Sequence, residues 1–506
     1  MEELLNLVAS LSHAEKRQFN LGKSAGTAAY LYLFNLIDKQ KYAGWQTIKE
    51  AFQKKYPSGS AESSAQYLYK LILQALVENK IKNDDAYKLV YSLLQVKILK
   101  ERNLHADAYA EVRRNQKLAE KYLDLPILYM LKREELNFLS DSNYSGIKEK
   151  ELIAKQVAAK DVLRDIKTIH EHHTLYELLK HRLNNSPQII TEDTKKELND
   201  LVFSEIAIIN SNSRQTMESK KFHLLFQSFY FIKTSDYRSA LRTFYILNEL
   251  YESKLINLQH PPVEYYAMLD GILDSLRMIG HYDEMEYFLN KLALLGKREY
   301  PDYFNLLIKK TIFLSRLGIA SSKNEWNTAL DVIKNSDPDV IRLNKLINQQ
   351  KQTELLFYVS LVYYKTNQLN NAKKSLNNII LMQQVDHDSF IYRIARLFNV
   401  VMYYENDDQE FLKYEIRSYK RIFGGKTKIL SLEKFVFKVV SIDPRRLSKY
   451  NNQLHWQKLQ PIRDSICSNN FESGLLKYFN FLEWAESLFS SGKPPKRFAV
   501  ANPGVL

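Results

Sequence analysis

The chain has 506 residues, with 72 lysines and arginines against 58 aspartates and glutamates, and a formal net charge of +14 at pH 7. No stretch approaches the roughly 18 uninterrupted apolar residues of a membrane-spanning helix. The single cysteine, Cys467, excludes an internal disulfide and a cysteine-based zinc site. The acidic start, Met1-Glu2-Glu3, lacks the basic and apolar segments of a secretory signal. We therefore expect a cytoplasmic protein that makes no membrane contact, whose positive charge permits acidic partners without requiring them.

Glycine and proline are scarce, at 14 and 12 residues. Prolines such as Pro126, Pro301 and Pro338 lie between apolar periodic segments, where proline suits the first turn of a helix. No alternating apolar run is long enough for a sheet, so the sequence predicts an all-α chain. We divide it into four parts: an N-terminal helical cap domain at 1–80, irregular helical hairpins at 81–217, helical repeats at 218–410, and a basic C-terminal helical region with a loose tail at 411–506.

The N-terminal part reads as several short helices, and Ser12 with Glu15 predicts a capping box at the start of one of them. The run from Leu11 to Phe19 resembles the start of uncharacterised bacterial helical-repeat proteins, a resemblance that implies no activity. Three of the short helices could form a helix-turn-helix. A cap for the repeats is the alternative that we favour, because no strand-like hairpin follows Val77 and residues 66–70 carry only one positive charge.

A histidine-rich helix follows within residues 161–183. Four side chains that zinc would accept share one side of it: His170, His173, Glu177 and His181. Apolar residues share much of the same stripe, so His173 could equally pack in the core. Thr174 stands where an HExxH motif would need its second histidine. We predict no metal and no cofactor.

A short signature then recurs between residues 219 and 384. An aromatic residue or leucine is followed three places later by a small or slender residue: Tyr237 and Ala240, Tyr282 and Met285, Trp326 and Ala329, Leu369 and Ala372. The second members are 45, 44 and 43 positions apart, and a fixed period of this size is typical of stacked helical hairpins. A turn-like residue precedes each signature by two places: Ser235, Gly280, Asn324 and Asn367. A single hairpin cannot bury its apolar face alone, so neighbouring hairpins must cover it.

These residues resemble tetratricopeptide repeats. Leu224 and Phe231 lie where the first helix of such a repeat has its apolar residues, and Phe244 lies where the second helix has one. The resemblance covers about a third of the chain, with a longer period than the usual 34 residues. It implies a right-handed α-solenoid of antiparallel hairpins with helical caps at both ends. It says little about function, because such repeats serve unrelated partners.

The resemblance also implies which side chains face inward from the first helices. Counting back from each small residue gives three sets: Phe222, Leu225, Phe229 and Ile232; Ala267, Asp270, Asp274 and Arg277; Glu354, Phe357, Leu361 and Tyr364. An apolar patch would lie beside a charged one, which suits an amphipathic helix or an extended peptide. We select eight of them as candidate partner-binding residues: Phe222, Phe229, Asp270, Asp274, Arg277, Glu354, Phe357 and Tyr364. The alternative is that the hairpins bury some of them against the next repeat.

Residues 413–449 carry eleven basic side chains and three acidic ones. Aromatic residues interleave, so the region could offer phosphate contacts and stacking surfaces. The alternative is a solvated helix face with its aromatics in the core. The candidate nucleic-acid contacts are Arg417, Lys420, Arg421, Lys426, Lys428, Arg445 and Arg446. The run 424–427, Gly-Gly-Lys-Thr, ends like a phosphate-binding loop, but the required earlier glycine is Lys420, so we interpret the run as a turn.

No nucleophile or acid–base motif with its supporting context is present, and we predict no catalysis and no small-molecule substrate. The sequence favours a non-enzymatic scaffold that binds a protein or peptide on the inner face of the repeats. The alternative is a nucleic-acid-associated regulator that uses residues 413–449 or the N-terminal helices.

Overall fold

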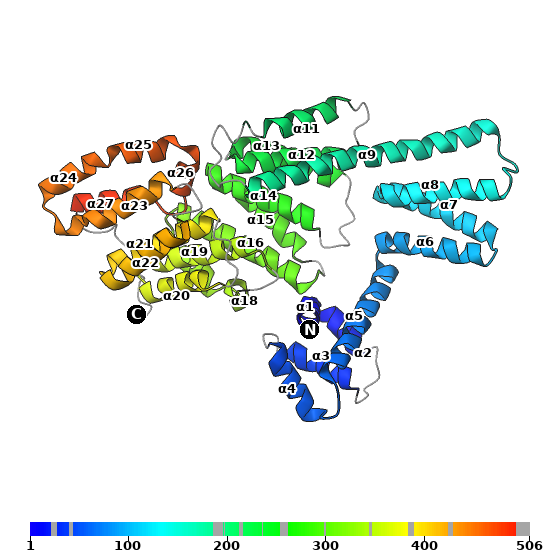
Figure 1. Cartoon of the computed structure of the whole chain (residues 1–506), viewed down its shortest axis with the longest axis horizontal. Helices are drawn as coiled ribbons and strands as arrows, with labels where there is room; N and C mark the ends of the chain where they lie inside the picture. The colour runs from blue at the N-terminus through cyan, green and yellow to red at the C-terminus, as the bar shows by residue number, and fades with distance from the viewer. Residues whose placement is uncertain are drawn as a thin grey trace.

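A computed structural model describes residues 1–21, 28–39, 44–185, 196, 198–211, 216–234, 236–253, 262–297, 300–343, 347–382, 389–423 and 429–491. Over these residues the chain is helical and contains no strand, which confirms the predicted all-α class. Figure 1 shows three parts in chain order: an N-terminal bundle, an extended arm and a larger helical body.

The N-terminal bundle has its own apolar core, which includes Phe34, Phe52 and Leu68. Its helices are α1 (Glu2–Ser10), α2 (His13–Leu21), α3 (Ala29–Lys39), α4 (Trp45–Lys55) and α5 (Ala61–Asn83). The predicted capping box is present, because the Glu15 carboxylate accepts from the Ser12 backbone N–H at 2.8 Å while the Ser12 hydroxyl accepts from the Glu15 N–H at 3.2 Å. The bundle reaches the body where α1 contacts α16.

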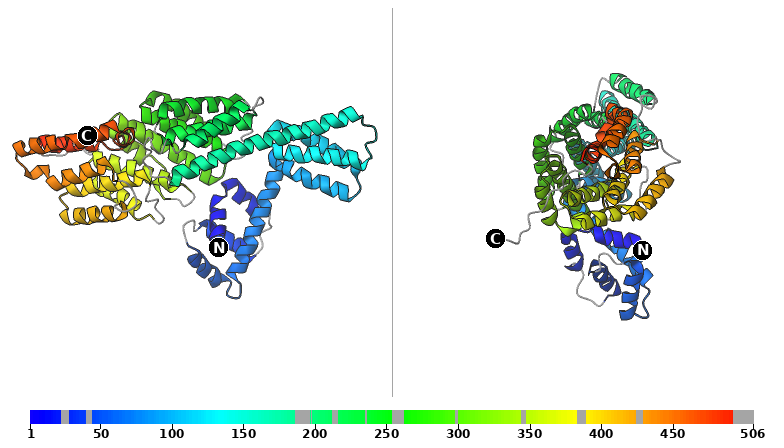
Figure 2. Two further views of the ribbon diagram at one scale, coloured as in Figure 1. Left: turned by 45° about the horizontal axis from the view of Figure 1, so that its top comes forward. Right: turned by 90° about the vertical axis from the view of Figure 1, so that its left-hand side faces the viewer.

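The arm consists of four helices that each pack against the next: α6 (Asp85–Glu101), α7 (His105–Tyr122), α8 (Leu125–Asp141) and α9 (Glu149–Asn185). In the left view of Figure 2 the long helix α9 runs from the far end of the arm back to the body. Its last turns pack against α12, so α9 belongs to both parts.

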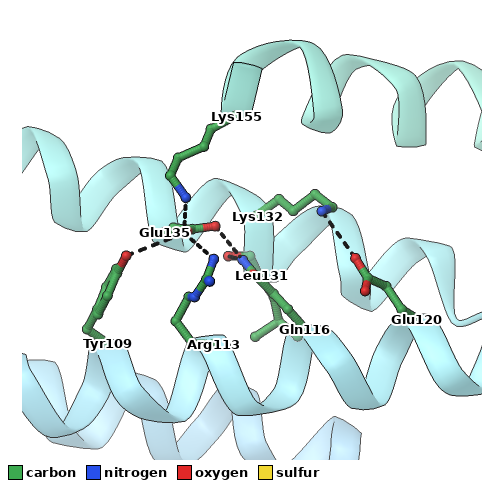
Figure 3. Close-up of polar contacts among 8 residues, drawn as sticks. All are labelled: Tyr109, Arg113, Gln116, Glu120, Leu131, Lys132, Glu135 and Lys155. Carbon is green, nitrogen blue, oxygen red and sulfur yellow. Dashed lines mark hydrogen bonds and ion pairs between the residues drawn. The ribbon is translucent and has the colours of Figure 1, made fainter. Parts of the chain in front are cut away.

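A buried carboxylate holds the arm together. Glu135 on α8 accepts hydrogen bonds from Lys155 of α9 at 2.6 Å, Gln116 of α7 at 2.8 Å and Arg113 of α7 at 3.0 Å (Figure 3). Burial opposes ionisation of Glu135, but these donors outweigh it and lower its pKa. One charge thus joins three helices.

The body contains residues 218–410, for which the sequence predicts repeats. Its helices are α11 (Asn199–Ser211), α12 (Met217–Lys233), α13 (Tyr237–Ser253), α14 (Val263–Ile279), α15 (Tyr282–Leu295), α16 (Asp302–Ser322), α17 (Trp326–Lys334), α18 (Pro338–Ile341), α19 (Gln349–Lys365), α20 (Leu369–Ile380), α21 (Phe390–Glu405), α22 (Gln409–Phe423), α23 (Ser431–Ile442), η1 (Pro444–Arg446), α24 (Lys449–Lys458), α25 (Gln460–Ser468), α26 (Asn470–Leu475) and α27 (Phe481–Ser491). Pairs form between α12 and α13, α14 and α15, α16 and α17, α19 and α20, and α21 and α22. The first helices α14, α16, α19 and α21 also contact one another in that order.

The signature residues occupy equivalent places in these pairs. Helices α13, α15, α17 and α20 begin at Tyr237, Tyr282, Trp326 and Leu369, the residues that open each signature. The fourth residue of each helix is the small or slender one, and all four are 0% exposed: Ala240, Met285, Ala329 and Ala372. The periodic pattern therefore predicted the starts of these four helices and the burial of these four residues correctly.

The turn that joins two helices of a hairpin also recurs. Gly280, Asn324 and Asn367 adopt φ values of 83°, 57° and 62°, and the next residue donates its backbone N–H to a carbonyl five positions back. This is the Schellman closure, for which glycine and asparagine are the favoured left-handed residues. Ser235, the fourth predicted turn residue, lies outside the described residues. In the arm, Asn103 at φ 61° makes the same turn before His105, and Ala108 is again buried.

The predicted division at 410/411 does not coincide with a break in packing. One apolar core runs from Phe313 to Phe489 and includes α21, α22 and α23. A smaller core that joins Leu179 to Phe226 crosses the other predicted boundary, at 217/218. In the right view of Figure 2 the last helices, in red, lie at the end of the body that faces the viewer, and α27 contacts α23, η1 and α24. Residues 476–480, which join α26 to α27, are called the C-terminal segment below. Its Tyr478 makes ring contacts with Phe357 of α19 and Phe390 of α21, so the segment packs against the first helices.

Candidate functional site

The first helices of the hairpins line an open groove of about 570 Å³. Helices α12, α14, α16 and α19 supply most of its wall, α9 closes one end, and Tyr478 lies at the other. Gly271 on α14 allows the ring of Phe244 to come close, since a Cβ at this position would lie 2.4 Å from that ring. The groove, called the inner groove below, therefore depends on backbone packing as well as on side chains.

A buried arginine forms the polar end of the inner groove. Arg277, 8% exposed, donates to the Glu354 carboxylate at 2.7 Å and to the Tyr358 hydroxyl at 2.6 Å, and it also pairs with Asp274. Its guanidinium lies 5.6 Å from the ring centroid of Tyr478. Burial alone would lower the pKa of Arg277, but its anionic neighbours hold that pKa well above its usual value. The cation is therefore permanent, and it joins α14, α19 and the C-terminal segment.

A second ion pair lies one turn along the same wall. Lys351 of α19 pairs with Asp270 of α14, and its ammonium group lies 5.5 Å from the ring centroid of Tyr266. The Tyr266 hydroxyl is within 2.6 Å of the Thr311 hydroxyl on α16. The acidic side chains of this wall are thus matched by cations of the wall itself.

The other end of the inner groove is aromatic and carries positive charge. Phe229 of α12 is half-buried and packs edge-on against Tyr176 of α9, with ring centroids 6.0 Å apart. Lys180 lies 4.6 Å from the Tyr176 ring centroid and 5.9 Å from that of Phe229, and Lys233 lies 5.5 Å from Phe229. An apolar group that entered here would contact aromatic faces under two ammonium groups.

The structure brings five of the eight candidate partner-binding residues to the inner groove: Phe229, Asp270, Asp274, Arg277 and Glu354. Three aromatic candidates require correction because they are in the core. Phe222 is 6% exposed against His173 and Tyr176, Phe357 is 0% exposed, and Tyr364 is 2% exposed and donates its hydroxyl to Glu405.

The reason for the correction is packing that the repeat spacing does not encode. Tyr478 of the C-terminal segment packs against Phe357, and the neighbouring Phe479 packs against Tyr364. Helix α9 covers Phe222 in the same way. Four further residues line the groove that the repeat spacing did not predict: Tyr176, Lys180, Lys351 and Tyr478. Lys351 could have been found, since it lies one helical turn before Glu354, whereas nothing in the repeat places Tyr478 there.

The basic candidates separate into three groups. Arg417, Lys420 and Arg421 lie exposed on α22. Arg445 and Arg446 instead pair with Asp443 at 3.2 Å and 2.9 Å, and Arg445 stacks 3.9 Å from the Tyr404 ring centroid, so both have structural partners. Lys426 and Lys428 lie outside the described residues, as does the whole run 424–427.

The histidine-rich helix does not assemble the four predicted side chains around one point. His170 and His181 are exposed, and His173 packs against Phe222 with ring centroids 3.6 Å apart. The buried histidine is His172, whose Nδ1 is 2.7 Å from the Glu205 carboxylate. Across the residues that the structure describes, no group of three or more histidine, cysteine, aspartate or glutamate side chains could hold a metal ion.

No protein-family model matches the chain, and a search of curated proteins finds no significant match. Among the described helices, none combines the length and the apolar character that crossing a membrane would require.

Proposed function

We propose that this chain is a tetratricopeptide-like α-solenoid that binds a peptide or protein segment in the inner groove and has no catalytic activity of its own. The observation that carries the proposal is the position of the groove. It lies on the face of the first helices, and five residues selected from the repeat spacing line it. The stepwise contacts of α14, α16, α19 and α21 support a solenoid, and its right-handed sense follows from the resemblance to tetratricopeptide repeats.

The chemistry of the groove favours a peptide over a small substrate. Small-molecule sites usually direct a few free polar groups at their ligand. Here Asp270, Asp274 and Glu354 are each matched by a cation of the wall. What the groove offers is an aromatic surface around Phe229 and a polar rim, which suits one apolar anchor on a peptide. The exposed thiol of Cys467 suits a reducing compartment, and we place the protein in the cytoplasm.

The experiment is a peptide selection followed by binding to two matched variants. Peptides from a random display library are selected on the full chain, and their affinities are measured by fluorescence anisotropy. Ala267 is exposed within the inner groove, and Ala293 is exposed on α15, outside it. We expect Ala267→Trp to weaken binding at least tenfold and Ala293→Trp to leave it within twofold. Selected peptides that bind both variants as well as wild type would overturn the proposal.

A further inference from the structure

A second surface, separate from the inner groove, combines unpaired cations with exposed aromatic rings. It lies on α22 and the start of α23, called the α22–α23 face below. Lys413, Arg417, Lys420 and Arg421 are exposed on α22, and Lys434 and Lys438 on α23. In the part of the chain that the structure describes, no carboxylate lies within 4.0 Å of these six cations.

The acidic residues of the region point away from this surface. Glu415 is 4% exposed and pairs with Arg396 of α21 at 2.5 Å. Glu433 is 2% exposed and pairs with Arg393 of α21 at 2.6 Å. The third, Asp443, is occupied by Arg445 and Arg446. The mixed charge of the sequence is therefore sorted by folding, with the acids inside or paired and the cations outside.

The two helices present these cations together. The Lys420 ammonium lies 5.8 Å from the ring centroid of Phe437, and Phe437 packs edge-on against Tyr419 of α22. Lys438 is the next residue, and Lys434 lies one turn before it. From Lys413 to Arg421 the helix spans about 12 Å, so its four cations lie along one continuous stretch of surface.

Exposed rings accompany the charges. Tyr414 is 65% exposed and lies one turn before Arg417, and Phe411 is 56% exposed and stacks on Tyr403. Favourable interaction with the helix dipole would explain cations in the last turn of α22, such as Lys420 and Arg421, but not Lys413 and Arg417 in its middle. Glu410, in the first turn, is the exposed carboxylate on this helix.

We propose that the α22–α23 face binds single-stranded nucleic acid, with the lysines and arginines on phosphates and Tyr414 stacked on a base. The exposed ring favours this ligand over an acidic protein, because a carboxylate-rich partner would use the cations and leave Tyr414 in water. Base–aromatic stacking contributes about 1–3 kcal/mol per base. The proposal goes beyond peptide binding in the inner groove and does not depend on it.

The test measures binding of fluorescein-labelled dT20 to the full chain by anisotropy at 50–200 mM NaCl. We expect affinity to fall with salt, with a slope of log K against log salt of about −2 to −4, from about 0.7 counterion per phosphate. Arg417→Glu, Lys420→Glu and Arg421→Glu together should weaken binding more than tenfold. The control combines Lys97→Glu, Lys150→Glu and Lys160→Glu, exposed arm residues with the same total charge change, and should stay within threefold.

Two further measurements distinguish a nucleic-acid ligand from an acidic protein. Tyr414→Ala should weaken dT20 binding about fivefold or more, Tyr414→Phe should retain it, and Ala267→Trp should leave it unchanged. No binding at 50 mM NaCl would overturn the proposal, as would equal losses in the two charge-reversed triples. Polyglutamate that competes as well as unlabelled dT20, with no effect of Tyr414→Ala, would identify an acidic protein as the partner instead.

Discussion

The arm and the body both contain a buried charge that joins several helices, but they place it differently along the chain. In the arm, Glu135 takes its donors from residues at most 26 positions away, on helices that follow one another. In the body, Arg277 binds Glu354 and Tyr358 at separations of 77 and 81 positions and also meets Tyr478. The arm is therefore closed by local contacts, and the body by contacts that bring distant hairpins and the C-terminal segment together.

The arm also leaves more of its apolar side chains exposed to water than the body does. Helix α6 buries Leu89 and Val96 but leaves Val90, Leu94 and Ile98 about half exposed. In the body, α19 and α21 are buried almost all round. A chain of hairpins that pack only against sequence neighbours leaves one side in water, whereas a structure closed by its own C-terminal segment does not. We expect the two regions to unfold as separate transitions that respond to different substitutions.

Arg277→Met should have the largest effect. It leaves the carboxylates of Glu354 and Asp274 without their cation in a buried site, and breaking a buried ion pair costs about 3–5 kcal/mol. Denaturant unfolding should show the body transition at lower denaturant in the fluorescence of Trp326, Trp456 and Trp484. The arm contains no tryptophan, and its transition, followed by hydrogen exchange of its backbone amides, should be unchanged. Arg316→Met, an exposed arginine on α16, serves as the control and should cost under about 0.5 kcal/mol. If both variants lowered the stability of the body by the same amount, the ion pairs of Arg277 would contribute nothing to holding the distant hairpins together.

Glu135→Gln tests the arm in the same way. Four donors lose their charged acceptor, and we expect a cost of about 2–4 kcal/mol confined to the arm transition. The pKa of Glu135 lies below its usual value of 4.5, so its stabilisation is present above pH 4.5 and is lost as the pH falls through the lowered pKa. The difference between wild type and variant should therefore shrink as the pH falls below 4.5. Glu120→Gln, at the surface pair with Lys132 in Figure 3, should cost under about 1 kcal/mol at any pH.

Some features of this molecule follow from local sequence patterns, and others depend on distant parts of the chain. The starts of four helices and the burial of Ala240, Met285, Ala329 and Ala372 follow from a local pattern, because a small residue one turn into a helix marks where another helix approaches. The turn at Asn103 went unrecognised, since His105 replaces the aromatic or leucine of the signature. Phe357 and Tyr364 were predicted to face a partner, but a non-repetitive segment packs against them, and periodicity carries no information about such a segment.

The same limit applies to the charged residues. The eleven cations between residues 413 and 449 are visible in the sequence, but their separation into paired and exposed groups is not. That separation depends on Arg393 and Arg396 of α21, which neutralise Glu433 and Glu415 from outside the region. A count of charges in one stretch cannot anticipate partners contributed by another helix.

Lys310 provides a pH-dependent test that reports on the body alone. This lysine is 1% exposed, donates to the Arg342 carbonyl at 2.7 Å, and burial lowers its pKa to about 8. Between pH 8 and its usual value of 10.5 the unfolded chain holds a proton that the folded chain has lost, so this group makes stability rise with pH in that window. Lys310→Met should remove about 1–3 kcal/mol of that rise. Lys309→Met, at the exposed neighbouring position, should retain it, and an unchanged pH profile for Lys310→Met would contradict the assignment.

The smallest effect is expected at the turn that both regions share. Asn103 in the arm and Asn367 in the body adopt left-handed backbone conformations, at φ 61° and 62°. A Cβ there costs about 1 kcal/mol, which asparagine partly offsets and alanine does not. Asn→Gly at either site should therefore be neutral or stabilising by about 0.5 kcal/mol, and Asn→Ala should destabilise by about 0.5–1 kcal/mol.

Substitutions at Asn103 should shift only the arm transition, and those at Asn367 only the body transition. Gln368→Ala is the control, because Gln368 has a φ of −96° that any residue adopts, and it should shift neither. If an Asn103 variant moved both transitions together, the arm and the body would form one cooperative unit despite their different patterns of contact.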